Sequence, residues 1–262
     1  MDLKEHRMKN NSFIRHPWEL ARLNIVKMFI SKYYARQEAN ILDIGTGDGF
    51  SLEQISYLFK KNNGFGLDVA LTKEELECLN NYFRKQKLNI SVVNSSGPIK
   101  NFSKENKFDI VCFMDVLEHV KNDIEFLKNN IKDYNLSDNT LFVITVPAFE
   151  RVFSSHDKFL EHYRRYTKES LQKVLCDADL KILDIGYFFF SLLIIRYFIC
   201  IIERIFKINK KFKGTANWSY GKLTSILVSK CLMLDFYVTQ IIKKLGILIP
   251  GLSVYAIAKR DI

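Results

Sequence analysis

Short apolar runs alternate with helix-like stretches through most of the chain, and this alternation restricts the possible folds more than any other feature. The apolar runs that we predict to be strands cover residues 40–45, 64–68, 89–93, 108–114 and 141–146. Apolar residues recur at helical spacing over 18–34, 50–60, 72–87 and 120–134. Strands and helices that alternate in this way form a parallel sheet with crossover helices on both faces. The predicted class is therefore α/β, with a doubly wound, mostly parallel sheet.

The last third of the chain departs from this pattern. A helix over 167–177 and a strand over 181–185 continue the pattern, and 251–259 is predicted to be a closing strand, which makes seven strands. Residues 187–249 instead contain two long apolar stretches separated by a basic one. We therefore divide the chain into a sheet domain, residues 1–186 and 250–262, and an apolar and basic helical insertion, residues 187–249.

A glycine-rich turn follows the first predicted strand. Gly45, Gly47 and Gly49 would permit positive φ angles and close approach of the backbone to a ligand. The turn lies at the carboxyl end of a strand, where doubly wound sheets bind their ligands. Asp43 and Asp48 place carboxylates where the pyrophosphate of a dinucleotide would be repelled, so an amino acid cation fits better.

Asp68 ends the second predicted strand, where a carboxylate can accept hydrogen bonds from both hydroxyls of a ribose. The same geometry occurs in NAD enzymes, so an NAD-dependent oxidoreductase is one alternative. The spacing GxGxG, with an aspartate two residues ahead, differs from the GxGxxG of dinucleotide folds. The other alternative is a glycine turn that only connects a strand to a helix.

The run 41–50, Asp68 and the run 108–120 resemble, in this order, the motifs of class I S-adenosylmethionine-dependent methyltransferases. The resemblance implies a Rossmann-like methyltransferase fold in which the sheet domain binds the cofactor S-adenosylmethionine and is catalytic. It implies that Asp43 and the glycine turn hold the methionine end of the cofactor and that Asp68 holds its ribose. Asp115 would form the far wall of the cofactor site. Asn94 and Ser95 would stand near the adenine, where many relatives have an aspartate. The implied cofactor contacts are Asp43, Gly45, Thr46, Gly47, Asp48, Gly49, Asp68, Val69, Asn94, Ser95, Asp115 and Val116.

The end of the fourth predicted strand carries the pattern D-x-x-E-H. This pattern is similar to one in metal-assisted O-methyltransferases of the ubiquinone-biosynthesis and small-RNA 3′-end types, in which a later histidine joins the ligands. The resemblance implies a divalent metal site made of Asp115, Glu118, His119 and His162. The same string also occurs in methyltransferases without metal, where the glutamate and histidine support the end of the strand.

A second cluster of polar side chains, residues 154–166, follows the fifth predicted strand. Without a metal, His156 or His162 could take the proton from an acceptor hydroxyl, and His119 is a further acid/base candidate. Arg164 and Arg165 could then bind an acidic group of the substrate. The alternative is that these charges pair among themselves at the surface.

The apolar and basic pattern of the insertion indicates contact with a membrane. Residues 187–206 approach the length of a bilayer span, but Arg196 in the middle favours an interfacial or re-entrant placement. The basic residues that follow suit anionic lipid headgroups, and they are Arg204, Lys207, Lys210, Lys211 and Lys213. The alternative is a buried helical cap over the acceptor pocket. Together with the motifs V-P-A, H-D and H-Y-R-R-Y, this segment resembles methyltransferases associated with glycan or lipid-linked saccharide assembly.

The net charge, the cysteines and the first residues of the chain bear on its partners and its location. The formal net charge of +10 suits an anionic partner such as a lipid surface or nucleic acid. The five widely spaced cysteines are typical of core thiols in a reducing compartment, and residues 1–11 lack the apolar core of a signal peptide, so we expect a cytoplasmic protein. The resemblances described above imply an activity, O-methylation of a lipid-linked, glycan or other partly apolar acceptor. The alternatives are an RNA-modifying methyltransferase and a scaffold that binds S-adenosylmethionine without transferring methyl; the oligomeric state is left open.

Overall fold

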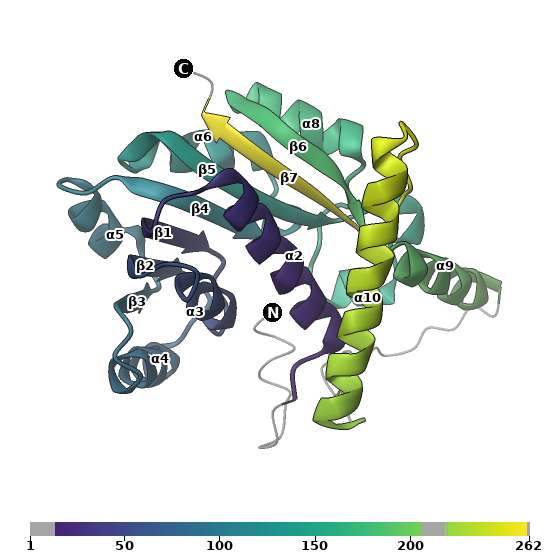
Figure 1. Cartoon of the computed structure of the whole chain (residues 1–262), viewed down its shortest axis with the longest axis horizontal. Coiled ribbons are helices and arrows are strands. Elements are labelled where there is room, and N and C mark those ends of the chain that lie inside the picture. The colour runs from purple at the N-terminus through teal and green to yellow at the C-terminus, as the bar shows by residue number, and fades with distance from the viewer. Residues whose placement is uncertain (1–13, 206–217, 219, 261–262) are drawn as a thin grey trace.

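The computed structural model describes residues 14–205, 218 and 220–260. Within this part of the chain the strands form one seven-stranded sheet with the order β3-β2-β1-β4-β5-β7-β6 (Figure 1). The strands are β1 (Glu38–Ile44), β2 (Lys61–Leu67), β3 (Ile90–Val93), β4 (Phe108–Met114), β5 (Leu136–Pro147), β6 (Leu180–Phe188) and β7 (Ser253–Arg260). The predicted fold is confirmed.

The first five strands run parallel, and β7 runs antiparallel to both of its neighbours, β5 and β6. Sequence order therefore reverses at β1, where the chain passes from the β2–β3 half of the sheet to the β4 half. In doubly wound sheets a ligand binds in the crevice beyond the carboxyl ends of the strands at this point. The glycine turn after β1 occupies that position.

Helices cover both faces of the sheet. On one face lie α2 (Pro17–Tyr33), α3 (Phe50–Ser56), α4 (Lys73–Lys85) and α10 (Gly221–Lys244). On the other lie α5 (Ser96–Ser103), α6 (Asp123–Asp133) and α8 (Lys168–Asp177). Successive side chains of a strand point to opposite faces of the sheet. Ile41 of β1 therefore packs in the core on one face, and Leu42 packs in the core on the other.

Several boundaries differ from those predicted. Helix α5 was not expected, and β5 begins at Leu136 rather than at residue 141. Helix α6 begins at Asp123 rather than at residue 120, because Leu117–His119 form a separate 3-10 turn, η1. All five cysteines are free thiols, but Cys78, Cys176 and Cys231 are exposed, so the prediction of core thiols holds only for Cys112 and Cys200.

The segment 187–249 contributes two helices, α9 (Phe190–Ile205) and α10. Figure 1 shows α10 lying along α2, while α9 projects from the body of the domain. Phe236 of α10 is fully buried and meets Phe29 of α2 edge to face, with ring centroids 5.8 Å apart. One side of α10 therefore belongs to the same core as the sheet.

We expect Phe236→Ala to lower the free energy of unfolding by about 3–5 kcal/mol, because it removes a fully buried aromatic ring. Leu234→Ala, on the exposed side of the same helix, should change it by less than about 0.5 kcal/mol. Urea denaturation of both variants measures the difference. Equal, small effects would show that α10 is not part of the folded core.

Candidate active site

The glycine turn has the backbone geometry that the sequence predicts. Gly45, Gly47 and Gly49 have φ angles of 74°, 57° and 72°, in the left-handed region that other residues rarely adopt. A Cβ atom added to Gly45 would lie 2.5 Å from Cγ2 of Val116, which follows β4. Of the three glycines only Gly45 is exposed at the switch point of the sheet, and its missing side chain lets Val116 pack against the turn.

Asp43 lies at the base of this turn with only 1% of its surface exposed. Neither carboxylate oxygen has a hydrogen-bond partner among the described residues. Burial raises the pKa of Asp43 to about 7, and the nearby Thr46 hydroxyl and the Arg22 guanidinium oppose that rise. Because a buried carboxylate without a partner is costly, the site favours a ligand that brings a positive charge or a donor.

Asp68 follows β2 and is fixed beside the turn. Its carboxylate accepts hydrogen bonds from the backbone N–H groups of Gly47 and Ala70, both at 3.0 Å. A carboxylate has about four acceptor positions, so the remaining ones can serve two ribose hydroxyls. Val69 is largely exposed next to Asp68, and the predicted adenine neighbours Asn94 and Ser95 follow β3 at the same edge of the sheet and are also exposed.

Asp115 follows β4 with a φ angle of 55°. Its carboxylate pairs with the Arg22 guanidinium and accepts a hydrogen bond from Thr145 Oγ1 at 3.2 Å. Val116 contacts the Gly45 backbone, as described above. Both residues therefore flank the glycine turn from the β4 side, where the resemblance puts the far wall of the cofactor site.

Arg22 is a site residue that the sequence analysis missed. It comes from α2, is buried, and lies near the carboxylates of Glu19, Asp43, Asp48 and Glu118. Burial lowers its pKa, and these carboxylates oppose that shift. The signal in the sequence was a charge pair, Glu19 and Arg22, at i and i+3 on the apolar side of the predicted helix. A buried guanidinium beside the turn can bind the carboxylate of an amino acid ligand.

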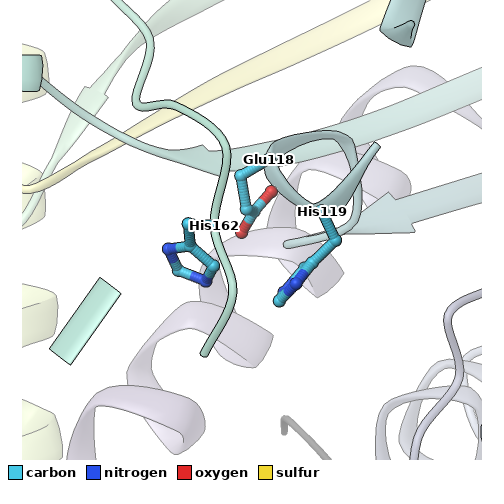
Figure 2. A group of neighbouring side chains, drawn as sticks. All are labelled: Glu118, His119 and His162. Carbon is cyan, nitrogen blue, oxygen red and sulfur yellow. The ribbon is translucent and has the colours of Figure 1, made fainter. Parts of the chain in front are cut away.

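Glu118, His119 and His162 come together beyond the carboxyl end of β4 (Figure 2). One possible ligand atom from each lies within 4.8 Å of the other two, and the two imidazole rings meet edge to face with centroids 4.6 Å apart. Glu118 is buried, and neither of its oxygens is hydrogen-bonded to a described residue. Burial raises the pKa of Glu118 to about 8, against the opposing charges of Arg22 and Arg165.

This group contains three of the four predicted metal ligands. The prediction for Asp115 needs correction, because its carboxylate points to Arg22 and is not a member of the group. The three remaining side chains are the donor types of sites with two histidines and one carboxylate, which bind zinc or iron in enzymes. The described residues therefore fit a divalent metal.

His162 is held by Asp157, whose Oδ1 lies 3.0 Å from Nδ1 of the imidazole. Asp157 is fully buried and also binds Arg165 at 2.8 Å and Arg196 at 3.1 Å. Burial alone would raise the pKa of Asp157, but the hydrogen bond to His162 and the two guanidinium groups hold it well below its usual range. Asp157 is therefore ionised, and it orients the His162 ring with its other nitrogen on the side of Glu118 and His119 (Figure 2).

The other predicted acceptor-side residues lie in the surrounding scaffold. Burial and the charge of Arg196 lower the pKa of His156 to about 4, so this imidazole is neutral near pH 7. The side chain of Arg165 is only 6% exposed and donates to Asp157 and to the Ala148 carbonyl, so its guanidinium serves the protein rather than the substrate. Arg164 pairs with Asp123 at 3.0 Å and remains partly exposed; its role in binding an anion stays a prediction.

A polar cavity of about 470 Å³ opens at the opposite edge of the sheet, at the amino ends of β1 and β2. Tyr34, Asn40, Lys61 and Asp109 are among its lining residues. The cofactor edge lies at the carboxyl ends of the same strands, so this cavity is separate from the site described above.

Comparison with known families gives the same answer as the geometry. Residues 18–185 match the family model described as a methyltransferase domain. The chain belongs to the class I S-adenosylmethionine-dependent methyltransferases. This methyltransferase is 32% identical over 117 residues to a mitochondrial ubiquinone biosynthesis O-methyltransferase of Dictyostelium discoideum, a match that covers 40% of the chain and only 36% of the relative. It is 21% identical over 232 residues to the ubiquinone biosynthesis O-methyltransferase of Rickettsia prowazekii, with 79% of this chain and 88% of that one covered.

Solved structures share the fold of this methyltransferase. The plantazolicin methyltransferase BpumL, in complex with a triazolic desmethylPZN analog and SAH, superposes with a TM-score of 0.54 at 18% identity, covering 93% of this chain and 86% of that one. The [4+2]-cyclase SpnF superposes with a TM-score of 0.56 at 14% identity, covering 96% and 85%. Because a cyclase has the same fold, the reaction has to be argued from the side chains of the site.

S-adenosylmethionine fits the residues at the glycine turn. The unpartnered Asp43 carboxylate suits its ammonium or sulfonium charge, Arg22 suits its carboxylate, and Asp68 suits the ribose. Cβ atoms at Gly45 and Gly49 would overlap the side chains of Val116 and Phe83, so glycine at these two positions is what lets the turn pack in this form. The cofactor contacts predicted from the sequence stay predictions, and Arg22 lies beside the glycine turn near Asp43 and Asp48.

We expect the affinity for S-adenosylmethionine to rise up to about tenfold between about pH 6 and about pH 8. The pKa of Asp43 is raised to about 7, so below that pH the carboxyl is protonated and gives no charge to hold a cation. Calorimetric titration across this range measures the effect. Asp43→Asn is the matched control and should bind weakly with a much flatter pH dependence; an equally steep profile in this variant would exclude Asp43 as the cause.

Proposed function

We propose that this protein transfers the methyl group of S-adenosylmethionine to an oxygen of a lipid-linked, glycan or other partly apolar acceptor. The observation that carries the proposal is the pair of Asp157 and His162, whose side chains are 0% and 7% exposed, on the same rim as the glycine turn. The cofactor supplies a methyl group that is already activated by its sulfonium. What remains for the protein is to position an acceptor and to remove its proton.

His162 is the proposed general base. Asp157 holds Nδ1 at 3.0 Å, which leaves Nε2 to take the proton of an acceptor hydroxyl. The acceptor oxygen forms a bond to the methyl carbon, the carbon–sulfur bond breaks with its electron pair left on sulfur, and the proton ends on Nε2. Ionised Asp157 stabilises the imidazolium that results.

A divalent metal at Glu118, His119 and His162 is the second candidate for the same step. The buried Glu118 carboxylate without hydrogen bonds beside two imidazoles favours it. Asp157 would then be the carboxylate that orients a metal-bound histidine, an arrangement common in metal sites. The metal would lower the pKa of an acceptor hydroxyl and so replace His162 as the means of activation.

Oxygen is the favoured acceptor atom because two of the similar proteins are named ubiquinone biosynthesis O-methyltransferases. A cytoplasmic location, which we propose also, agrees with five free thiols. RNA is the alternative acceptor that the net charge of +10 leaves open.

The test is to incubate the purified protein and S-adenosylmethionine with membrane, soluble and RNA extracts and to search each by mass spectrometry for a methyl mass increment. We expect the increment in the membrane extract, and expect it to be lost with Asp68→Ala, which should not bind the cofactor. Methylation confined to RNA would support the alternative. Calorimetric binding of S-adenosylmethionine without methylation in any extract would indicate a scaffold, and binding of NAD in its place would indicate an oxidoreductase.

A further inference from the structure

Three polar side chains of helix α9 that the structure describes face the protein. Arg196 binds Ser154 Oγ and, at 3.1 Å, Asp157; one turn later the Cys200 thiol lies 3.4 Å from the Val152 carbonyl. Glu203 accepts a hydrogen bond from Ser155 at 3.3 Å. These three residues, at i, i+4 and i+7, define one side of the helix, which faces the segment that carries Asp157.

The other side of α9 is apolar and exposed. Phe198 is 59% exposed and Ile202 49% exposed, and the same surface includes Ile194, Ile195, Tyr197, Ile199 and Ile205. In a surface helix of a soluble protein the apolar side faces the core and the polar side faces water. In α9 this arrangement is inverted. Arg196, which from the sequence alone argued against a membrane span, is directed away from the apolar surface.

Helix α10 shows the same inversion. Its buried side is mostly small or polar, with Ser225, Ser229, Leu232, Phe236 and Thr239 at heptad spacing. Its exposed side carries large apolar residues, among them Leu223, Leu227, Leu234, Tyr237, Val238 and Ile241. By length and composition α10 could cross a bilayer, with a mean hydropathy of 1.4 over its best window. Since its buried positions follow α2 over most of its length, a position on a membrane surface fits better than a span.

The charges near these apolar surfaces are mainly positive. Lys222, Lys230 and Lys244 are exposed on α10, whereas its one acidic residue, Asp235, binds Ser191 of α9 at 3.1 Å. The sequence that joins the two helices, 206–217, adds Lys207, Lys210, Lys211 and Lys213 and contains no acidic residue. These four lysines lie outside the described residues, as does the side chain of Arg204, so the prediction of a basic loop there stays a prediction.

We propose that the exposed sides of α9 and α10 dock on a lipid bilayer that contains anionic headgroups. Large apolar side chains would enter the boundary between headgroups and acyl chains, and the lysines would meet the negative surface charge. A second copy of this chain would bring lysines against lysines, so charge favours the anionic surface.

Docking through α9 would also bring a membrane-embedded acceptor close to the candidate active site. The inner side of α9 contacts Asp157 through Arg196, so the bilayer would lie about one helix diameter, roughly 10 Å, from the segment that holds His162. A membrane-embedded acceptor could then reach the site without leaving the bilayer. This last step rests on the proposed function, whereas docking itself does not.

The experiment is sedimentation of the full chain with phosphatidylcholine vesicles and with vesicles that also contain phosphatidylglycerol. We expect binding to the anionic vesicles, weakened by salt, and a loss on the order of tenfold or more for the double variant Phe198→Glu and Ile202→Glu. Leu183→Glu, at an exposed leucine of β6, is the matched control and should bind like the unaltered protein. Circular dichroism of each variant checks that it is folded.

Three results would overturn the proposal: no binding to anionic vesicles, equal binding by the double variant and the unaltered protein, or a stable dimer in ultracentrifugation that the double variant dissociates. Vesicle binding needs neither cofactor nor acceptor. If it persists while no extract is methylated, the proposed function fails and the docking surface stands.

Discussion

Asp68→Ala is expected to weaken the binding of S-adenosylmethionine by at least a hundredfold, about 3 kcal/mol. The carboxylate would accept hydrogen bonds from two ribose hydroxyls, each worth about 1.5–3 kcal/mol because the acceptor is charged. It also fixes the glycine turn through the Gly47 N–H at 3.0 Å. Isothermal titration calorimetry gives the affinity directly.

Asp133→Ala is the control for this measurement. Asp133 is an exposed carboxylate on α6 that pairs with Lys100, away from the glycine turn, and its loss removes the same charge. We expect its effect on affinity to be less than about twofold. If Asp68→Ala also stayed within that range, the ribose would have to bind elsewhere and the assignment of the whole cofactor site would fail.

His162→Gln is expected to lower kcat by about 10²–10⁴-fold while the affinity for S-adenosylmethionine stays the same. Glutamine can keep a hydrogen bond to Asp157 but cannot take a proton. His156→Gln should have only a small effect, because the pKa of His156 is lowered to about 4 and His156 is not one of the three side chains clustered around Glu118. Methyl transfer to the active extract measures both variants.

A chelator separates the two candidate mechanisms. With His162 as the base, the unaltered enzyme keeps its activity in the chelator; with a metal at Glu118, His119 and His162, it loses activity and regains it when the metal is restored. If His162→Gln retained full activity, both mechanisms would be excluded, since each requires this imidazole.

The order of strands and helices could be predicted from local periodicity, because each strand of a sheet covered on both faces is itself an apolar run. The exceptions have local causes. Helix α5 begins with Ser96, Gly97 and Pro98, residues typical of turns, and its helical state depends on Ile99 packing in the core between the sheet and its neighbours. The first residues of β5, around Asp138 and Asn139, are polar and exposed, so no apolar pattern marked them.

The arrangement of the acceptor side depends on contacts between distant residues. Glu118 and His162 are 44 positions apart, and the resemblance to metal-assisted relatives suggested their proximity while periodicity did not. The sequence analysis predicted that Arg165 binds the substrate. The structure instead pairs Arg165 with the buried Asp157, a contact that the sequence does not reveal. The sequence also does not show that Arg196 points toward the protein. An apolar helix with a few polar residues does not reveal which of its sides is buried when the apolar side is the exposed one.

The sequence alone thus determined the α/β class, the glycine turn and the carboxylates at the ends of β1 and β2, because these features depend on neighbours in the chain and on the rule that parallel strands end at one edge. Tertiary structure alone decided that Arg22 lies buried beside the glycine turn, that Asp115 pairs with it rather than joining the candidate metal ligands, and that α9 and α10 expose their apolar sides. The physical reason is that a buried charge must find its partner in space, and the partner of Arg22 lies 93 residues away along the chain.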